Sequence, residues 1–212
     1  MKKLSAILAF VLVLLTFTAC GSAGYEKTIE NYYKAIVNED AQKFMDLYAN
    51  DDYIDYLIKD SKKDEDKEND LDDEDDVLDI YEDRVKARLK NYEDEKEGEG
   101  LGKNIKYDVE VSSVRKFHKD DVAALAEYLD DKGYEKETVQ DVVYVSYTCR
   151  LTGDEGSYRE NRGSIVLKVS GKWYLTTALS GTDSVLKGII EGYDDDGLKA
   201  AFNNSDDYYY YE

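Results

Sequence analysis

The chain is poor in the residues that most often carry recognisable chemistry: its 212 residues include one histidine, two cysteines and no proline. His118 and the internal Cys149 are too few to supply the four nitrogen and sulfur ligands of a structural zinc site. The chain also lacks the G-x-S-x-G, H-E-x-x-H and C-x-x-C motifs, and GEGLGKN at 98–104 lacks the first glycine and the hydroxyl residue of a phosphate-binding loop. We therefore expect no metal site, no cofactor and no catalytic residue from motifs.

Positive charge is scarce as well. The chain has 28 lysines and arginines against 48 aspartates and glutamates, a net charge of −20. Without residues 1–19, which include Lys2 and Lys3, the net charge becomes −22. Such a negative field repels the phosphate backbone, so we exclude nucleic acid as a partner.

The N-terminus holds the longest apolar run, 16 uncharged residues from Leu4 to Ala19, preceded by two lysines. A membrane-spanning helix needs about 20 apolar residues, so this run is short for a permanent span. A basic start, a short apolar stretch and small residues at its end are typical of a removable export signal.

The end of this run resembles the lipobox of bacterial lipoprotein signal peptides. Thr18, Ala19 and Cys20 match that motif, and Phe17 stands where leucine is usual. The resemblance implies that residues 1–19 form the signal peptide, that cleavage occurs between Ala19 and Cys20, and that the Cys20 thiol carries diacylglycerol. Residues 20–24 would then form the lipidated end and a tether. Secretion after a cut near Ala23 and an uncleaved anchor are the alternatives.

Helical periodicity follows the signal. Apolar residues recur three and four positions apart over 25–40, which predicts an amphipathic helix. Asp40 is a candidate N-cap for a second, short helix at 41–48. The same spacing predicts further helices at 51–59, 75–93 and 119–132.

Strand periodicity begins after residue 104, where the apolar period changes from 3.6 to 2. The alternation from Ile105 to Phe117 predicts a strand with these two residues on one face. Cys149 shares its parity with Tyr147, which places the thiol on the inner face of a later strand. Ser170-Gly171 predicts a tight hairpin. The predicted strands are 105–117, 139–151, 162–169 and 172–179.

Helices that precede a run of antiparallel strands indicate an α+β domain. IENYYKAIVNEDAQKFMDLYAND, VVYVSYTCRL and GSIVLKVSGKWYLTTA resemble the opening helices and late strands of the NTF2-like superfamily, in particular its small bacterial lipoproteins. The resemblance implies N-terminal helices packed on a curved, mostly antiparallel sheet, forming a cone with an apolar cavity. It assigns 25–181 to this domain, with an acidic insertion at about 60–76 and a short helix and acidic, tyrosine-rich tail at 182–212.

The resemblance also bears on a site, because enzymes of that superfamily place a carboxylate with His or Tyr partners in the cavity. Asp46 is a candidate carboxylate, whereas His118 is flanked by charged residues and is expected to be exposed or to cap a helix. Tyrosines on an apolar stripe more often belong to the core, with the hydroxyl at its rim. The candidate pocket-lining residues are Tyr32, Tyr33, Tyr48, Tyr147 and Trp173.

The acidic segment has ten carboxylates in the 13 residues of 64–76. As an EF-hand loop starting at Asp64 it would have Asn69 where glycine is required and Asp75 where glutamate is required, so the pattern fails. We expect a solvated loop, with a weak site for calcium or for a cationic partner as the alternative. The carboxylates of 72–76 would stabilise the N-terminus of the following helix.

Together these features predict a membrane-anchored lipoprotein on the extracytoplasmic face of the cell membrane. The lack of proline and the abundance of lysine, asparagine and tyrosine favour an AT-rich genome and a Gram-positive cell surface. We expect a non-catalytic binding module for an envelope protein or a small ligand. The alternatives are a dehydratase- or isomerase-like cavity enzyme acting on a small apolar substrate, and calcium-dependent adhesion through the acidic segment.

Overall fold

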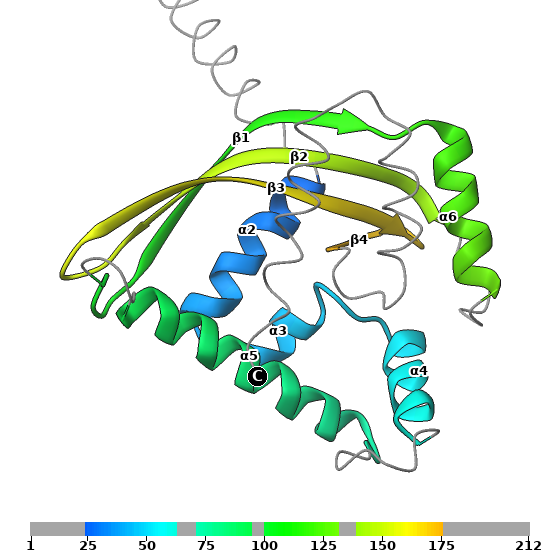
Figure 1. Cartoon of the computed structure of the whole chain (residues 1–212), viewed down its shortest axis with the longest axis horizontal. Coiled ribbons are helices and arrows are strands. Elements are labelled where there is room, and N and C mark those ends of the chain that lie inside the picture. Colours follow the sequence, from blue (N-terminus) through cyan, green and yellow to red (C-terminus); the bar gives the residue numbers. More distant parts are fainter. Residues whose placement is uncertain (1–23, 63–70, 95–99, 132–138, 176–212) are drawn as a thin grey trace, which may run out of the picture.

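The computed structural model describes residues 24–62, 71–94, 100–131 and 139–175, and these form an α+β arrangement, as predicted (Figure 1). Helices come first and a four-stranded sheet follows. The helices are α2 (Gly24–Val37), α3 (Ala41–Met45), α4 (Asp51–Ser61), α5 (Glu74–Asp94) and α6 (Lys119–Asp131). The strands are β1 (Lys106–Lys116), β2 (Val139–Thr152), β3 (Ser157–Val169) and β4 (Lys172–Leu175).

Local capping explains where the short N-terminal helices begin. Glu39 adopts a positive φ of 52° and ends α2. The Asp40 side chain then accepts the backbone N–H of Lys43 at 3.1 Å, which confirms the predicted N-cap of α3. Asn50 caps α4 in the same way, accepting the N–H of Tyr53 at 2.9 Å.

The sheet is an antiparallel meander in the order β1-β2-β3-β4. A loop at 153–156 joins β2 to β3, and Gly153 donates its N–H to the Gly156 carbonyl at 2.9 Å. Ser170 and Gly171 have φ of 47° and 88°, so the predicted tight hairpin between β3 and β4 is confirmed. Across the ladder Cys149 lies opposite Glu160, and Tyr147 lies opposite Arg162.

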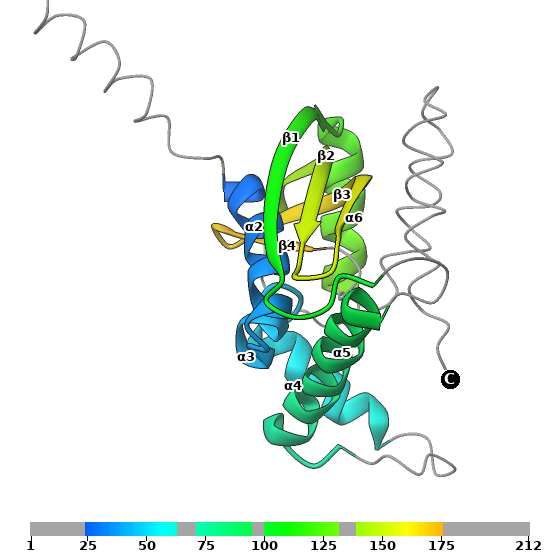
Figure 2. The same cartoon turned by 90° about the vertical axis from the view of Figure 1, so that its left-hand side faces the viewer.

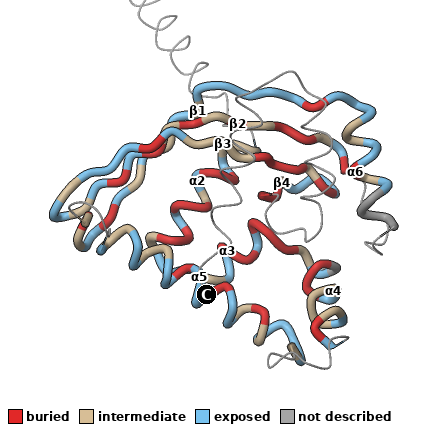
Figure 3. The backbone as a smooth tube through the Cα atoms, in the orientation of Figure 1, coloured by how far each residue is buried: buried red, intermediate tan, exposed pale blue. Residues whose placement is uncertain are grey.

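The sheet is arched, and α2 lies beneath its concave face (Figures 1 and 2). Helix α2 contacts β1 and β4, while α3 and α5 pack on α2 and on each other. Buried positions concentrate on α2, α3 and the half of β2 and β3 nearest α6, whereas the 153–156 end of the sheet is more exposed (Figure 3). Helix α6 packs against β2, with Leu125 fully buried.

A β-bulge between Val111 and Ser113 corrects the prediction for the first strand. The extra residue, Ser112, shifts the alternation, so the parity that links Ile105 with Phe117 does not place them on one continuous strand face. All side chains of β1 after Val111 are exposed. Phe117 is buried just beyond the strand, where its N–H bonds to the Val142 carbonyl at 3.0 Å.

Several predicted boundaries also change. Gly24, placed in the tether, is the first residue of α2. Helix α4 reaches Ser61 and α5 begins at Glu74, so both ends of the predicted 60–76 loop are helical. Strand β3 begins at Ser157, five residues earlier than predicted. The predicted signal at 1–19, the lipidated Cys20, residues 176–179 of the last strand and the tail at 182–212 lie outside the described residues. Among the described helices, none has the length and apolar content needed to cross a membrane.

Candidate functional site

The concave face of the sheet carries a group of polar side chains directly over α2. Tyr33 projects from α2, Tyr147 from β2, and Glu160 and Arg162 from β3; we call these four residues the concave-face cluster. Strand pairing places them together, because inward positions of β3 lie opposite inward positions of β2. Tyr33 arrives there because it belongs to the buried stripe of α2.

Glu160 is the centre of the cluster and is only 8% exposed. Arg162 Nε lies 2.6 Å from Glu160 Oε2. The Tyr33 hydroxyl donates to Glu160 Oε1 at 3.2 Å. Both carboxylate oxygens are therefore engaged, one by a guanidinium and one by a phenol, and the opposite charges compensate each other inside the fold.

A shell of aromatic rings surrounds this pair. The Tyr33 ring meets the Tyr147 ring edge-on, with centroids 6.3 Å apart, and stacks on Tyr107 of β1 at 6.4 Å. The Tyr147 hydroxyl shares a 3.3 Å hydrogen bond with Ser164. These contacts fix the orientation of the phenols around Glu160.

A second guanidinium approaches from α5. Arg88 hydrogen-bonds to the Tyr32 hydroxyl and lies over the Tyr32 ring, 5.5 Å from its centroid. It also lies 5.8 Å from the centroid of Phe44. Since Tyr32 packs edge-on against Tyr33 with centroids 5.0 Å apart, Arg88 is linked to the cluster through two adjacent rings.

Burial sets the ionisation of the neighbouring groups. It raises the pKa of Tyr33 and of Tyr147 above the usual value, so both phenols stay protonated at physiological pH. Burial also raises the pKa of the Cys149 thiol to about 12. Because the thiolate is the reactive form of cysteine, Cys149 is an inert thiol here, as its fully buried position requires.

The structure brings three of the five candidate pocket residues together: Tyr32, Tyr33 and Tyr147. Tyr48 is buried further along, between Phe44 at 5.0 Å and Tyr81 at 6.3 Å between centroids. Trp173 lies near the start of α2, against Tyr25. The predicted inward position of Cys149 is confirmed.

The two candidate acid–base residues lie outside the cluster. Asp46 is exposed at the C-terminus of α3, where its side chain accepts a hydrogen bond from Gln42 at 3.2 Å. His118 is exposed, and its carbonyl accepts the N–H groups of Asp121 and Val122 in the first turn of α6. The prediction that His118 is exposed or helix-capping is confirmed.

Sequence reasoning missed Glu160 because the predicted strand begins only at 162, and it missed Arg162 because that residue is the polar first position of the predicted strand. Their stretch, Ser157–Ser164, is polar on both faces and has no apolar alternation. A usable signal was nevertheless present. Two glycines, Gly153 and Gly156, bracket a turn directly after the previous strand, so the returning strand must pair from residue 157 onwards. Parity across that turn then places Glu160 on the same face as Cys149.

The described part of the acidic segment has a structural use. Asp73 Oδ1 accepts the N–H groups of Asp75 at 3.0 Å and Asp76 at 3.3 Å, and Asp76 Oδ2 accepts the N–H of Asp72 at 2.6 Å. These carboxylates satisfy amides at the start of α5, as predicted for the helix N-terminus. Among the residues that the structure describes, no group of three or more His, Cys, Asp or Glu is placed to hold a metal ion. Residues 63–70 lie outside them.

No protein-family model, curated protein or solved structure matches this chain. The function is therefore inferred from the sequence and from the contacts within the chain.

Proposed function

We propose that the protein is a lipid-anchored protein of the extracytoplasmic membrane face whose NTF2-like domain is a non-catalytic binding module. The observation that carries the non-catalytic part is the state of Glu160. Of the described residues it is the only buried carboxylate, and Arg162 and Tyr33 occupy both of its oxygens. A general base must have a carboxylate oxygen available to take a proton from the substrate, and both oxygens of Glu160 are already engaged by groups of the chain itself.

The NTF2-like assignment rests on architecture. Helices come first in the chain, an antiparallel meander follows, and the arched sheet closes over α2 (Figure 1). These are the features that the resemblance implies. We propose in addition that the helices and sheet form a cone with an apolar cavity, and that the segment at about 60–76 is an acidic insertion.

The lipid anchor rests on the sequence before Gly24. A basic start, a 16-residue apolar run and a cysteine directly after Ala19 support a diacylglycerol on Cys20. Two acyl chains suffice for stable anchoring, whereas one chain gives only marginal binding. On a Gram-positive cell this would hold the domain at the outer face of the cell membrane.

The anchor is tested by changing each of the two cysteines in the full chain. Cys20→Ala should remove the diacylglycerol adduct from the intact mass and release the protein from the membrane fraction or leave it unprocessed. Cys149→Ala is the matched control and should keep both the adduct and membrane partition. An unchanged mass and partition in Cys20→Ala would refute the anchor.

The binding role is tested by cross-linking the anchored protein in whole cells and identifying the envelope components that copurify. Arg88→Gln changes a half-buried guanidinium next to the cluster, and Lys90→Gln changes an exposed lysine two residues further along α5. We expect loss of a specific partner with Arg88→Gln only. Recovery of the same components at the same yield with both variants would show that the surface around Arg88 is not the binding surface.

One observation favours the enzyme alternative: the Tyr33 hydroxyl bonds to the buried Glu160 carboxylate. A dehydratase or isomerase could use such a pair if Glu160 were released from Arg162. The calcium alternative has no support among the described residues beyond the negative charge of 72–76. Calorimetry of the full chain with millimolar Ca²⁺ decides it, since absence of heat would eliminate calcium-dependent adhesion.

A further inference from the structure

The only tryptophan of the chain, Trp173 on β4, packs against the first turn of α2. A Cβ on Gly24 would lie 2.3 Å from Trp173 Cδ1, so only glycine permits this approach without a shift of the ring. The Tyr25 ring meets Trp173 edge-on, with centroids 5.4 Å apart. The first turn of α2 therefore packs against the β3–β4 hairpin. We call this region the α2–β4 corner, and it comprises Gly24, Tyr25, Lys27, Lys168, Lys172 and Trp173. Lys168 is paired with Trp173 on one face of the hairpin, and Lys172 lies on the other face beside Tyr174, next to the turn.

This corner is locally basic in a strongly acidic chain. Lys168 Nζ lies 6.0 Å from the Trp173 ring centroid, and Lys172 Nζ lies 4.9 Å from that of Tyr174. Lys27 is exposed in the first turn of α2. Residues 168–175 contain no acid, and the first turn of α2 contains one, Glu26.

The acid that faces the corner across the sheet is already paired with another lysine. Asp141 lies directly opposite Lys168 in the ladder, and Lys116 Nζ is 3.0 Å from its Oδ2. The positive charge of the corner is thus not cancelled by this neighbour. Against a net charge of −20 for the chain, the corner is suited to an anionic surface that the rest of the molecule would repel.

Chain length places the corner close to the lipid. Three residues separate Cys20 from Gly24, and an extended chain spans at most about 3.6 Å per residue. The first Cα of α2 is therefore held within about 14 Å of the Cα of Cys20. The headgroup layer on one side of a bilayer is roughly 5–8 Å thick, so the start of α2 cannot leave the neighbourhood of the membrane surface.

The residues at this position are those that membrane interfaces favour. Trp and Tyr rings are enriched at the headgroup level, because they combine an apolar body with a polar group. Lysine stems lie along apolar surface while their ammonium groups reach anionic headgroups. Trp173 is partly exposed and stands beside both a tyrosine and a lysine.

We propose that the α2–β4 corner docks on the headgroups of an anionic bilayer, with Trp173 at the interface, so that the anchored domain has one fixed orientation. This rests on the proposed lipidation of Cys20. The start of α2 and the β3–β4 hairpin lie on the same side of the molecule, opposite α6, so the corner can face a bilayer without obstruction from that helix (Figure 2).

The test uses the full, lipidated chain in phosphatidylcholine vesicles with and without phosphatidylglycerol. Because Trp173 is the only tryptophan, fluorescence excited beyond the tyrosine absorption reports on this residue alone. We expect lipids with a headgroup nitroxide to quench Trp173 strongly in the anionic vesicles and weakly in the neutral ones. Added salt should reduce the quenching, since the attraction is screened.

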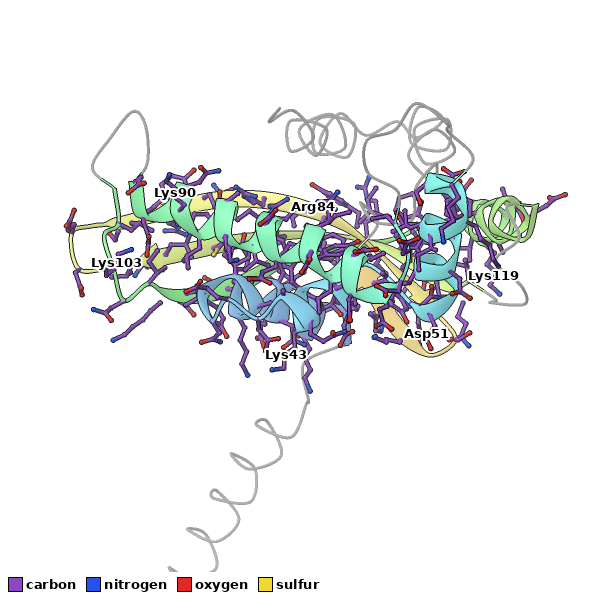
Figure 4. The ribbon with its side chains drawn as sticks, turned by 90° about the horizontal axis from the view of Figure 1, so that it is seen from below. Lys43, Asp51, Arg84, Lys90, Lys103 and Lys119 are labelled. Carbon is purple, nitrogen blue, oxygen red and sulfur yellow. The ribbon has the colours of Figure 1, made fainter. Side chains whose placement is uncertain are left out.

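Charge reversal supplies the second arm. Each lysine near an anionic surface changes the docking equilibrium roughly fivefold, so Lys168→Glu with Lys172→Glu should abolish the difference between the two vesicles. Lys90→Glu is the matched control and should leave the quenching of Trp173 unchanged. Lys90 lies at the end of α5 that is remote from the β3–β4 hairpin, which is drawn in orange (Figure 4).

Two failures are distinguishable. A chain without the diacylglycerol mass, or one that does not bind vesicles, would overturn the proposed anchor. The docking proposal would be overturned, with the anchor left intact, if the chain is lipidated and bound to vesicles but the quenching of Trp173 is the same with and without anionic lipid and is unchanged by the two lysine substitutions.

Discussion

The two halves of β3 differ although they pair with the same neighbouring strand. From Ile165 to Val169 the side chains are apolar except for Lys168, and positions on both faces of the strand are buried. From Ser157 to Ser164 they are mostly polar, and only Glu160 is buried. Backbone pairing with β2 continues through both halves. The same ladder therefore carries an apolar core at one end and a buried charge pair at the other, and the two halves differ in their side chains rather than in their backbone pairing.

The largest expected effect comes from breaking the charge pair of the polar half. Arg162→Met should lower the free energy of unfolding by about 3–5 kcal/mol, because the buried Glu160 carboxylate loses its guanidinium partner. Urea unfolding followed by circular dichroism measures the loss. Adding Glu160→Gln removes the remaining charge and should recover more than half of it. No recovery in the double variant would show that Arg162 acts through packing rather than charge.

The matched control is Arg159, which lies on the same strand but points to the opposite face of the sheet. Arg159 is exposed and stands directly opposite Arg150 of β2. Arg159→Met removes a cross-strand pair of like charges, so the free energy of unfolding should change by less than about 0.5 kcal/mol. A loss as large as that of Arg162→Met would mean that the difference between the two faces of β3 has been misassigned.

The apolar half should respond to volume. Leu167 is fully buried, and Leu167→Ala should cost about 3 kcal/mol through lost burial and the cavity left behind. Ile80→Ala on α5 is the control, because Ile80 is 38% exposed and its truncation should cost well under 1 kcal/mol. Both are measured by the same urea unfolding. Equal losses in the two variants would contradict an apolar core centred on this half.

The same division separates what could be predicted from sequence. The apolar half of β3 and the Ser170-Gly171 turn follow from local pattern, and Asp40 is recognisable as a cap. The Ser112 bulge is not recognisable, because an extra residue leaves no mark in the alternation until the partner strand is known.

The candidate site was not predicted, for a related reason. Glu160 and Arg162 resemble solvent-facing residues until the turn at 153–156 fixes their register with β2. Their burial depends on Tyr33, which is 127 residues away in the chain. Only tertiary pairing turns such polar residues into an interior site.

A smaller effect should follow from removing one hydroxyl. Tyr33→Phe keeps the ring but removes the donor to Glu160 Oε1, which should cost about 1.5–3 kcal/mol because the acceptor is charged. Tyr107→Phe is the control, since the Tyr107 ring stacks on Tyr33 but Tyr107 is only half-buried. It should cost under about 0.5 kcal/mol. If the two variants lose equal stability, the hydroxyl bond is not what holds the cluster.

The smallest expected effect on stability comes from Cys149, which lies opposite Glu160 in the ladder. The reactivity of its thiol shows whether the polar half of β3 is closed to solvent. Its pKa of about 12 means that at pH 8 the folded thiol is protonated, whereas an unfolded thiol ionises near pH 8.5. The folded state thus holds its proton where the unfolded state has lost it, so this group lowers stability as pH rises from about 9 towards 12. Iodoacetamide at pH 8 should leave Cys149 unmodified in the native chain and alkylate it in urea, as followed by peptide mass spectrometry. Equal rates in the two conditions would mean that the polar half opens in the native state, and the contrast between the halves of β3 would then lie in dynamics as well as in charge.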